Sequence, residues 1–494
     1  MLTDSAIAAL RSDLLAADYT LGSVSDRLGP TALAALARNS SLAARRVLGE
    51  ATDPQADAIR LWLLQQAVPA GRLAGWSSLA WLRAAGLLTG GAELRAAIEL
   101  KPHGSDRVEG WICCDQTPLD GRVTQPRPDF VLGASPASTT LTQLVPPRHY
   151  RRVLDLGTGC GIQALHLDAD EIVATDLNPR ALELARIGLG LSGVTADLRL
   201  GSLYDPVAGE KFDLIVTNPP YVLSPPSADR LVYREGGFSG DDLMRTVVSR
   251  AGEHLADAGL LVVLGNWAVV DPEPWTERVA AWIGDAGCDA LVLQRELLDP
   301  YEYVELWLAD AGLAGSPDYE RRYAEWLDYF DTCGIGGVGM GWIVLARSGR
   351  RPPVVRVEEW PHAVHQPVGQ AFGDFFAAIA SSQQPDAEFR AGTLRLHPGV
   401  VQESIAVPGA ADPSHIVLRQ QFGFGRAVEV GTALAAIVGA CDGDLPVDVL
   451  ISAVAVLLEV PAAELGAELT GPLRELVADG FLTGVEPASL GGAS

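Results

Sequence analysis

Two turns in this chain combine residue types that act on a bound ligand. The first, residues 155–161, reads Asp-Leu-Gly-Thr-Gly-Cys-Gly, and its three glycines let the backbone approach a ligand closely. The second, Asn218-Pro219-Pro220-Tyr221, holds polar groups in a backbone that two prolines restrict. A Gly-x-Gly-x-Gly turn alone also occurs in nicotinamide-binding folds. The pairing of the two turns therefore carries more information than either turn does.

Both turns follow apolar runs that have the length of buried strands. From residue 150 onward, strand patterns alternate with helix patterns; the predicted strands are 152–156, 171–175, 197–201, 212–217, 260–265, 290–295 and 342–347. This alternation predicts an α/β fold with a doubly wound, mostly parallel, seven-stranded Rossmann-like sheet. Ligands of such sheets bind at the carboxyl ends of the strands, which is where both turns lie.

Together the two turns resemble those of the class I S-adenosylmethionine-dependent methyltransferases. The Asn-Pro-Pro-Tyr string is similar to that of the group that methylates planar nitrogen atoms, which includes release-factor glutamine methyltransferases and small-domain RNA guanine or adenine N-methyltransferases. The resemblance covers about residues 125–350 and implies S-adenosylmethionine as the cofactor. Residues 236–243 are only similar to a Gly-Gly-x-Asp-Gly-Leu type string of the release-factor enzymes.

The resemblance also implies roles for individual residues. Asp155 would face the methionine portion of the cofactor, although an acid there also fits a turn or helix cap. Asp176 would accept hydrogen bonds from the ribose hydroxyls, and Leu177 would pack on the adenine ring. Ser202 stands where the family usually has an aspartate. The implied cofactor-binding residues are Asp155, Gly157, Thr158, Gly159, Gly161, Asp176, Leu177, Ser202, Leu203 and Asn218.

On the substrate side, the nitrogen of an amide is a poor nucleophile because its lone pair is delocalised. By the resemblance, the Asn218 side-chain oxygen and the Pro219 carbonyl accept its N–H groups, and Tyr221 stacks on the flat substrate. These three are the predicted catalytic residues. The predicted substrate-side residues are Pro220, Thr139, Thr140 and Trp267.

Two of these placements have alternatives. Thr139 and Thr140 stand where the family has a segment that covers the cofactor, but Pro126-Arg127-Pro128-Asp129, farther upstream, also matches a family string. Trp267 and its neighbour Asn266 follow a strand and would shape the pocket, whereas a core tryptophan explains Trp267 equally well.

The flanks lie outside the resemblance. Residues 1–115 show helices followed by a β-ribbon, the order of a winged-helix-like domain, and residues 351–494 predict a mostly helical accessory α+β module that is also winged-helix-like. Residues 125–350 form the predicted methyltransferase domain, in which 297–340 is an insertion. Such flanking modules dock macromolecules and allow a homodimer. In the N-terminal module, any phosphate contacts would be made by Arg38, Arg45, Arg46 and Arg83.

Composition narrows the choice of substrate. The formal net charge is −25, which opposes non-specific phosphate binding. No run reaches the length of a membrane span, the first residues lack a signal-peptide pattern, and the six cysteines show no metal-binding spacing. We therefore predict a cytoplasmic enzyme without a metal that methylates a glutamine-like amide of a protein. The alternatives are an adenine or guanine amine of a nucleic acid, a natural product, and a non-catalytic cofactor-binding adaptor.

Overall fold

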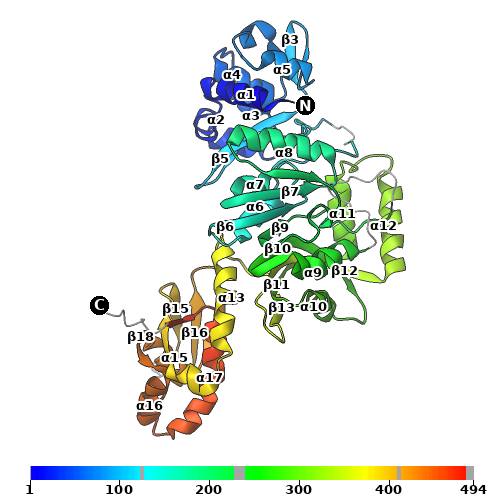
Figure 1. Ribbon diagram of the computed structural model, residues 1–494. Coiled ribbons are helices and arrows are strands. Elements are labelled where there is room, and N and C mark those ends of the chain that lie inside the picture. The colour runs from blue at the N-terminus through cyan, green and yellow to red at the C-terminus, as the bar shows by residue number, and fades with distance from the viewer. Residues whose placement is uncertain (1, 123–126, 227–239, 409–412, 486–494) are drawn as a thin grey trace. The chain divides into compact units, whose positions relative to one another are not determined.

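The computed structural model describes residues 2–122, 127–226, 240–408 and 413–485 (Figure 1). The chain forms two compact units. The first contains Met1–Thr142 and Arg148–Trp360, and the second contains Gln143–Pro147 and Pro361–Ser494. No helix among the described residues is both long and apolar enough to cross a membrane.

An eight-stranded sheet organises the first unit, with strand order β13-β11-β12-β10-β9-β6-β7-β8. Its strands are β6 (Tyr150–Leu156), β7 (Ala169–Asp176), β8 (Asp197–Leu200), β9 (Phe212–Thr217), β10 (Leu255–Val270), β11 (Asp289–Leu298), β12 (Ile335–Ala346) and β13 (Val355–Glu359). β12 runs antiparallel to β10 and β11, and every other pair in the sheet is parallel. The predicted Rossmann-like α/β fold is confirmed.

The sheet has one strand more than the seven that the sequence predicts. β13 pairs parallel with β11 through Ala290–Gln294 and so extends the domain past residue 350. Its sequence, Val-Arg-Val-Glu-Glu, is short and charged, as is common for an edge strand. Its alternation of apolar and charged residues includes only Val355 and Val357, which is a weak strand signal.

Helices cover the sheet at α6 (Pro136–Leu144), α7 (Ile162–His166), α8 (Pro179–Ser192), α9 (Asp242–His254) and α10 (Trp275–Ala286). Local sequence sets the ends of α8. The Asn178 side chain accepts the Arg180 N–H, Pro179 occupies the first turn, and Gly193 closes the helix in the left-handed region. The apolar side chains of the strands, such as Leu154 and Val292, are fully buried. Each stabilises the fold by about 1.5–3 kcal/mol.

The insertion between β11 and β12 forms α11 (Pro300–Asp310) and α12 (Tyr319–Cys333), which pack against each other (Figure 1). Asp299 caps α11 by accepting the N–H groups of Tyr301 and Glu302. Aromatic residues of both helices bury Tyr303 together with Leu223, which lies just beyond the Asn-Pro-Pro-Tyr turn. The insertion therefore supports the chain that leaves this turn.

The N-terminal part begins with helices and ends with short strands. The helices are α1 (Asp4–Ala16), α2 (Leu21–Leu36), α3 (Leu42–Leu48), α4 (Pro54–Ala58), the short π-helix η1 (Ile59–Leu63), the short 3-10 helix η2 (Ala70–Leu73) and α5 (Leu79–Ala84). The strands are β1 (Val68–Pro69), β2 (Leu88–Gly90), β3 (Glu93–Ala96), β4 (Glu99–Gly104) and β5 (Glu109–Cys114). β1, β3 and β2 form one small sheet in that order, and β4 pairs with β5.

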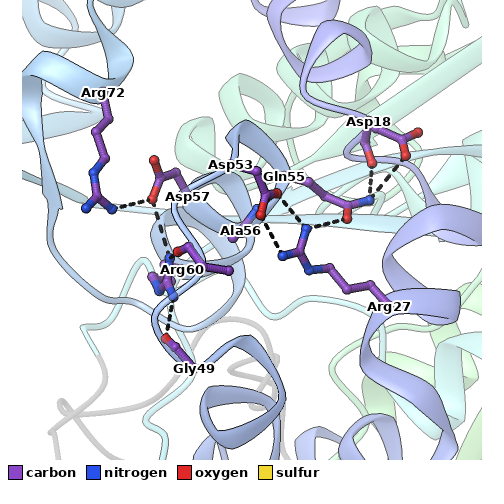
Figure 2. A network of polar contacts seen from close by, with 10 residues as sticks. Asp18, Arg27, Gly49, Asp53, Gln55, Ala56, Asp57, Arg60 and Arg72 are labelled. Atoms are coloured by element: carbon purple, nitrogen blue, oxygen red, sulfur yellow. Dashed lines mark hydrogen bonds and ion pairs between the residues drawn. The ribbon is translucent and has the colours of Figure 1, made fainter.

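Hydrogen bonds join this N-terminal part to the large sheet through α8, against which β5 and α1 pack (Figure 1). The Trp111 N–H donates to Ser192 Oγ at 2.9 Å. A Cβ added at Gly188 would lie 3.1 Å from the Trp111 carbonyl oxygen, so a larger residue there would press β5 away by a few tenths of an ångström. Within the N-terminal helices, Arg27 of α2 binds both carboxylate oxygens of Asp53, which caps α4 (Figure 2).

The second unit has its own core. Its elements are α13 (Gly369–Ser382), α14 (Asp386–Ala391), β14 (Thr393–Leu396), β15 (Val400–Ile405), β16 (His415–Gln420), β17 (Ala427–Val430), α15 (Thr432–Gly439), β18 (Asp442–Pro446), α16 (Val447–Leu458), α17 (Ala462–Ala478) and β19 (Leu482–Val485). The strands form two three-stranded sheets, β18-β14-β19 and β15-β16-β17. Phe389, Leu473 and Phe481 are among the residues buried between sheet and helices.

Candidate functional site

A pocket of about 200 Å³ opens at the carboxyl ends of the parallel strands. Its lining comes from the turns after β6, β7, β8 and β9, from the segment that precedes α6, and from Leu243 of α9. The following residues from the predicted site line it: Gly157, Thr158, Gly159, Asp176, Leu177, Ser202, Leu203, Asn218, Pro219 and Pro220. The fold thus brings most of both sequence motifs to one cavity.

The glycine turn after β6 has the shape that a ligand-binding turn requires. Gly157 and Gly159 have φ angles of 76° and 55°, and a Cβ added at either residue would meet no atom within 4 Å. Gly161 differs, because its added Cβ would lie 3.2 Å from Leu189 of α8. Gly157 and Gly159 therefore form an open backbone surface at the pocket, and Gly161 allows helix packing.

Asp176 at the end of β7 is the acidic residue that faces the pocket. Its carboxylate accepts hydrogen bonds from the Gly159 N–H at 2.9 Å and the Asn178 N–H at 2.8 Å. Burial raises its pKa above the ordinary aspartate value, while the backbone hydrogen bonds oppose that shift. An ionised carboxylate offers about four lone-pair positions. Lone-pair positions on the Asp176 carboxylate therefore remain available to accept hydrogen bonds from hydroxyl groups of a ligand.

Asp155 lies at the carboxyl end of β6, where the protein itself supplies hydrogen bonds to its carboxylate. It is 1% exposed, does not line the pocket, and accepts hydrogen bonds from Thr158 Oγ1 at 2.6 Å and the Ala164 N–H at 3.2 Å. Burial raises its pKa to about 7. In this structure Asp155 holds the glycine turn against α7, which is the alternative role given above.

The Asn-Pro-Pro-Tyr turn presents a buried polar atom that has no hydrogen-bond partner among the described residues. Asn218 Oδ1 accepts no hydrogen bond from the part of the chain that the structure describes, although the atom is buried. An unsatisfied buried acceptor costs about 1–3 kcal/mol, so such atoms are rare. The strand before it is firmly held, since Thr217 Oγ1 donates to the Leu156 carbonyl at 2.7 Å. A ligand N–H group would satisfy Asn218.

Tyr221 lies beside the pocket in a smaller cavity that also touches Pro220 and Asn266. Its ring meets Trp307 of α11 edge-on, with 6.3 Å between ring centroids. Burial raises the pKa of Tyr221 to about 12, so the phenol stays protonated at neutral pH. Tyr221 therefore packs against the insertion and is not among the residues that line the larger pocket.

Three predicted substrate-side residues do not line the cavity. Trp267 is fully buried, stacks on Trp275 at 5.4 Å and donates to Gln294 Oε1 at 2.9 Å, so it belongs to the core. Thr139 and Thr140 lie on α6, and the lining there comes instead from Ser135 and Ser138. The correction has a simple cause, because neighbouring residues on a helix point in different directions.

The segment that closes the pocket follows the Pro-Arg-Pro-Asp string, of which Pro126 lies outside the described residues. Phe130, Val131, Leu132 and Gly133 line the cavity. The Asn178 side-chain amide donates to the Asp129 carbonyl at 2.9 Å. Asp115 accepts the Val131 N–H at 2.9 Å and pairs with Arg180 at 2.5 Å.

Sequence reasoning missed this segment as lining, together with Cys160, Gln163 and Leu243. The Pro-Arg-Pro-Asp string was the one sequence signal for this segment. The ion pair beside it could not be predicted from local sequence, because Asp115 is 65 residues away from the arginine that it binds. Among the described residues, no group of three or more His, Cys, Asp or Glu residues could hold a metal ion.

Comparison with known families gives two matches. Residues 133–272 match the methyltransferase small domain family, and this range contains both turns and most of the pocket lining. Residues 16–97 match a domain of unknown function, DUF7059. The pocket and its fold thus lie in a segment that is similar to methyltransferases.

Individual proteins that are similar to part of this chain are also named as methyltransferases. The release factor glutamine methyltransferase of Deinococcus radiodurans is 37% identical over 159 residues, which are 29% of this chain and 54% of that protein. The ribosomal protein uL3 glutamine methyltransferase of Bradyrhizobium diazoefficiens is 34% identical over 152 residues, 28% of this chain and 48% of that protein. The ribosomal protein L11 methyltransferase of Symbiobacterium thermophilum is 43% identical over 100 residues, 18% and 32% of the two chains. The chain spans about half the length of the first two relatives.

Proposed function

We propose that this protein is an S-adenosylmethionine-dependent methyltransferase that transfers a methyl group to the side-chain amide nitrogen of a glutamine in a protein substrate. The unsatisfied oxygen of Asn218 in the pocket carries the proposal. Residue 218 lies within the segment that matches the methyltransferase small domain family, and two similar proteins are named as glutamine methyltransferases.

The residues at the pocket fit the cofactor. Gly157 and Gly159 leave backbone open to a ligand, Asp176 keeps acceptor positions for ribose hydroxyls, and the exposed Leu177 offers an apolar surface for a purine ring. Ser202, which lines the cavity, would accept from an adenine amino group. S-adenosylmethionine, when bound, supplies an electrophilic methyl group on its sulfonium.

The chain's own contribution is to bind and orient the amide. Asn218 Oδ1 would accept one N–H of the glutamine amide and the Pro219 carbonyl the other, so the nitrogen lone pair is directed into the pocket. Tyr221, protonated at neutral pH, is unsuited as a base. Asp176, with its hydrogen bonds to Gly159 and Asn178, lies at the ribose end. The surplus proton leaves the nitrogen after transfer, which is why no positioned base is needed.

A second function keeps the same site and changes the substrate. An exocyclic amine of adenine or guanine is also planar and carries two N–H groups, so Asn218 and Pro219 suit it as well. The relatives' substrates and the net charge of −25 favour the protein amide. These substrates also support a cytoplasmic location.

The flanking parts fit recognition modules. We propose that residues 1–115 are winged-helix-like, supported by β1 lying between helical turns and pairing with the β2–β3 hairpin that follows α5. In residues 351–494 the β18-β14-β19 sheet similarly combines strands on either side of α16 and α17. A homodimer through these modules stays a prediction.

The test uses the full chain with methyl-labelled cofactor and a lysate of the source organism. Protease should remove the label and nuclease should leave it, and peptide mass spectrometry should place the methyl group on a glutamine side chain. Purified release factor and ribosomal protein uL3 are the first individual substrates to try. Label that nuclease removes would show that the substrate is a nucleobase and not a protein amide. If neither protein nor nucleic acid is labelled, the non-catalytic cofactor-binding adaptor is the remaining alternative.

A further inference from the structure

A second hollow, of about 660 Å³, lies in the N-terminal part and shares no lining residue with the pocket described above. Its wall is formed by α3, η1, η2, β3 and the loop at 119–122. Five arginines line it: Arg45, Arg60, Arg72, Arg95 and Arg122. Only two acidic residues do so, Glu50 and Asp120. This concentration of positive charge is unexpected in a chain of net charge −25.

The base of the hollow is rigid. Asp57 is 2% exposed and pairs with Arg72 at 3.1 Å and Arg60 at 3.5 Å, and Figure 2 shows the two guanidinium groups on either side of it. Arg60 also donates to the Gly49 carbonyl at 2.7 Å and the Ala51 carbonyl. One carboxylate therefore serves two guanidinium groups, which leaves excess positive charge at a fixed position.

The rim carries more positive charge than the acidic residues that line the hollow can offset. Arg45 and Arg95 are exposed and have no ion pair or hydrogen bond within the described ranges. Arg122 donates to neutral groups, the Leu119 carbonyl at 3.1 Å and Gln65 Oε1 at 3.3 Å, which orient it without cancelling its charge. Asp120, the nearby acid, accepts the N–H and hydroxyl of Ser41 at 2.7 and 2.6 Å, and the charges of Arg45 and Arg122 also lower its pKa, so one carboxylate offsets part of the charge of two arginines.

We propose that this arginine hollow, defined by Arg45, Arg60, Arg72, Arg95 and Arg122, binds consecutive phosphate groups of a nucleic-acid backbone. Guanidinium groups match phosphate oxygens in a two-pronged geometry, and here they come from separate segments around an open volume large enough for more than one phosphate. Arg95 lies on the hairpin strand β3, next to the β1-β3-β2 sheet. The proposal stands independently of the methyl-transfer function.

The acidity of the whole chain does not oppose a local site of this kind. The Debye length is about 10 Å at 0.1 M ionic strength, so most of the chain's carboxylates are screened from the hollow. Residues 1–110 themselves carry 11 basic and 11 acidic residues. Binding should nevertheless weaken steeply with salt, because phosphate contacts release counterions.

The test measures fluorescence anisotropy of a labelled oligo(U) and oligo(dT) of about 12 nucleotides with the full chain, over a series of salt concentrations. Arg45→Gln with Arg95→Gln should weaken binding about tenfold or more and reduce the salt slope by about 1.4. The matched control is Arg11→Gln with Arg107→Gln, which removes two exposed arginines of the N-terminal part that lie outside the hollow. The control should bind within about twofold of the unmodified protein.

Calorimetry with S-adenosylmethionine checks that both double variants keep the fold of the first unit. Inorganic triphosphate and poly-glutamate serve as competing anions. Comparable affinities for oligo(U) and oligo(dT) support a site for the phosphate backbone. A preference for one of them identifies RNA or DNA as the ligand. The proposal is overturned by absence of oligonucleotide binding, by equal losses in both double variants, or by triphosphate or poly-glutamate binding more tightly than the oligonucleotides.

Discussion

The Asp176 carboxylate accepts the backbone N–H of Gly159 at 2.9 Å, which joins the turn after β7 to the glycine turn after β6. The same carboxylate accepts the Asn178 N–H, and the Asn178 side chain donates to the Asp129 carbonyl at 2.9 Å. One chain of hydrogen bonds therefore runs from the glycine turn to the segment that closes the pocket. The acid expected to bind ribose also sets the shape of its own site.

Replacing Asp176 should weaken cofactor binding. Asp176→Ala removes a charged acceptor, and a hydrogen bond to a charged group contributes about 1.5–3 kcal/mol, so affinity should fall by roughly 10- to 150-fold. Calorimetry with S-adenosylmethionine measures this. Asp170→Ala, on the exposed end of the same strand, is the control and should bind normally. Unchanged affinity of Asp176→Ala would remove this residue from the cofactor site.

The sequence predicted the sheet and both turns because these features are local. Glycine spacing, prolines and apolar runs depend on neighbouring residues, and the carboxyl ends of parallel strands meet in every fold of this class. Gly157, Asp176 and Asn218 were therefore predicted to share a site before their positions were known, and the structure places all three around one pocket.

What the sequence could not supply depends on long-range packing. Trp267 and Ser138 are both buried, yet only Ser138 lines the cavity, and nothing in their local patterns distinguishes them. Asp155 carries the right charge at the right strand end, but its carboxylate accepts hydrogen bonds from Thr158 and Ala164 and is not among the residues that line the cavity. The arginine hollow is assembled from segments as far apart as Arg45 and Arg122, which charge counting along the chain could not detect.

The buried Asp155 should make stability depend on pH. Burial raises its pKa to about 7 from 3.8, so between these values the folded protein binds more protons than the unfolded chain. The free energy of unfolding should therefore fall as the pH rises from about 4 to about 7. Asp155→Asn lacks this titration. Its melting temperature relative to the unmodified protein should rise from pH 5 to pH 8.

The control for this titration is Asp285→Asn, an exposed carboxylate on α10. Its melting temperature relative to the unmodified protein should lack the rise expected for Asp155→Asn. A constant difference between Asp155→Asn and the unmodified protein across this range would mean that Asp155 keeps an ordinary pKa in the folded state.

Asn218→Ala should separate catalysis from cofactor binding. The variant removes the acceptor proposed to orient the amide, and losing one such group lowers turnover by roughly 100-fold or more. S-adenosylmethionine affinity should stay nearly unchanged because the residue acts on the substrate. Asn218→Asp keeps an acceptor and should retain partial activity. Full turnover by Asn218→Ala, in the same assay that detects methylglutamine, would contradict the proposed role.

Tyr303 of α11 should act as a positioning residue for the Asn-Pro-Pro-Tyr turn. Its hydroxyl is fully buried and accepts the Leu223 N–H at 2.9 Å and the Asn266 side-chain amide at 3.1 Å. Tyr303→Phe leaves two buried donors unsatisfied, which costs about 1–3 kcal/mol each before relaxation. The chain beyond Tyr221 should loosen, and kcat should fall about tenfold while cofactor affinity is unchanged.

Tyr301→Phe is the matched control for this prediction, because Tyr301 lies on the same helix and is 58% exposed. It should retain both stability and kcat. Chemical denaturation and steady-state kinetics on the two variants distinguish the possible roles of Tyr303. Lower stability with normal kcat would make Tyr303 a packing residue only, whereas a joint loss of stability and kcat, absent in Tyr301→Phe, connects the insertion to the geometry of the proposed catalytic turn.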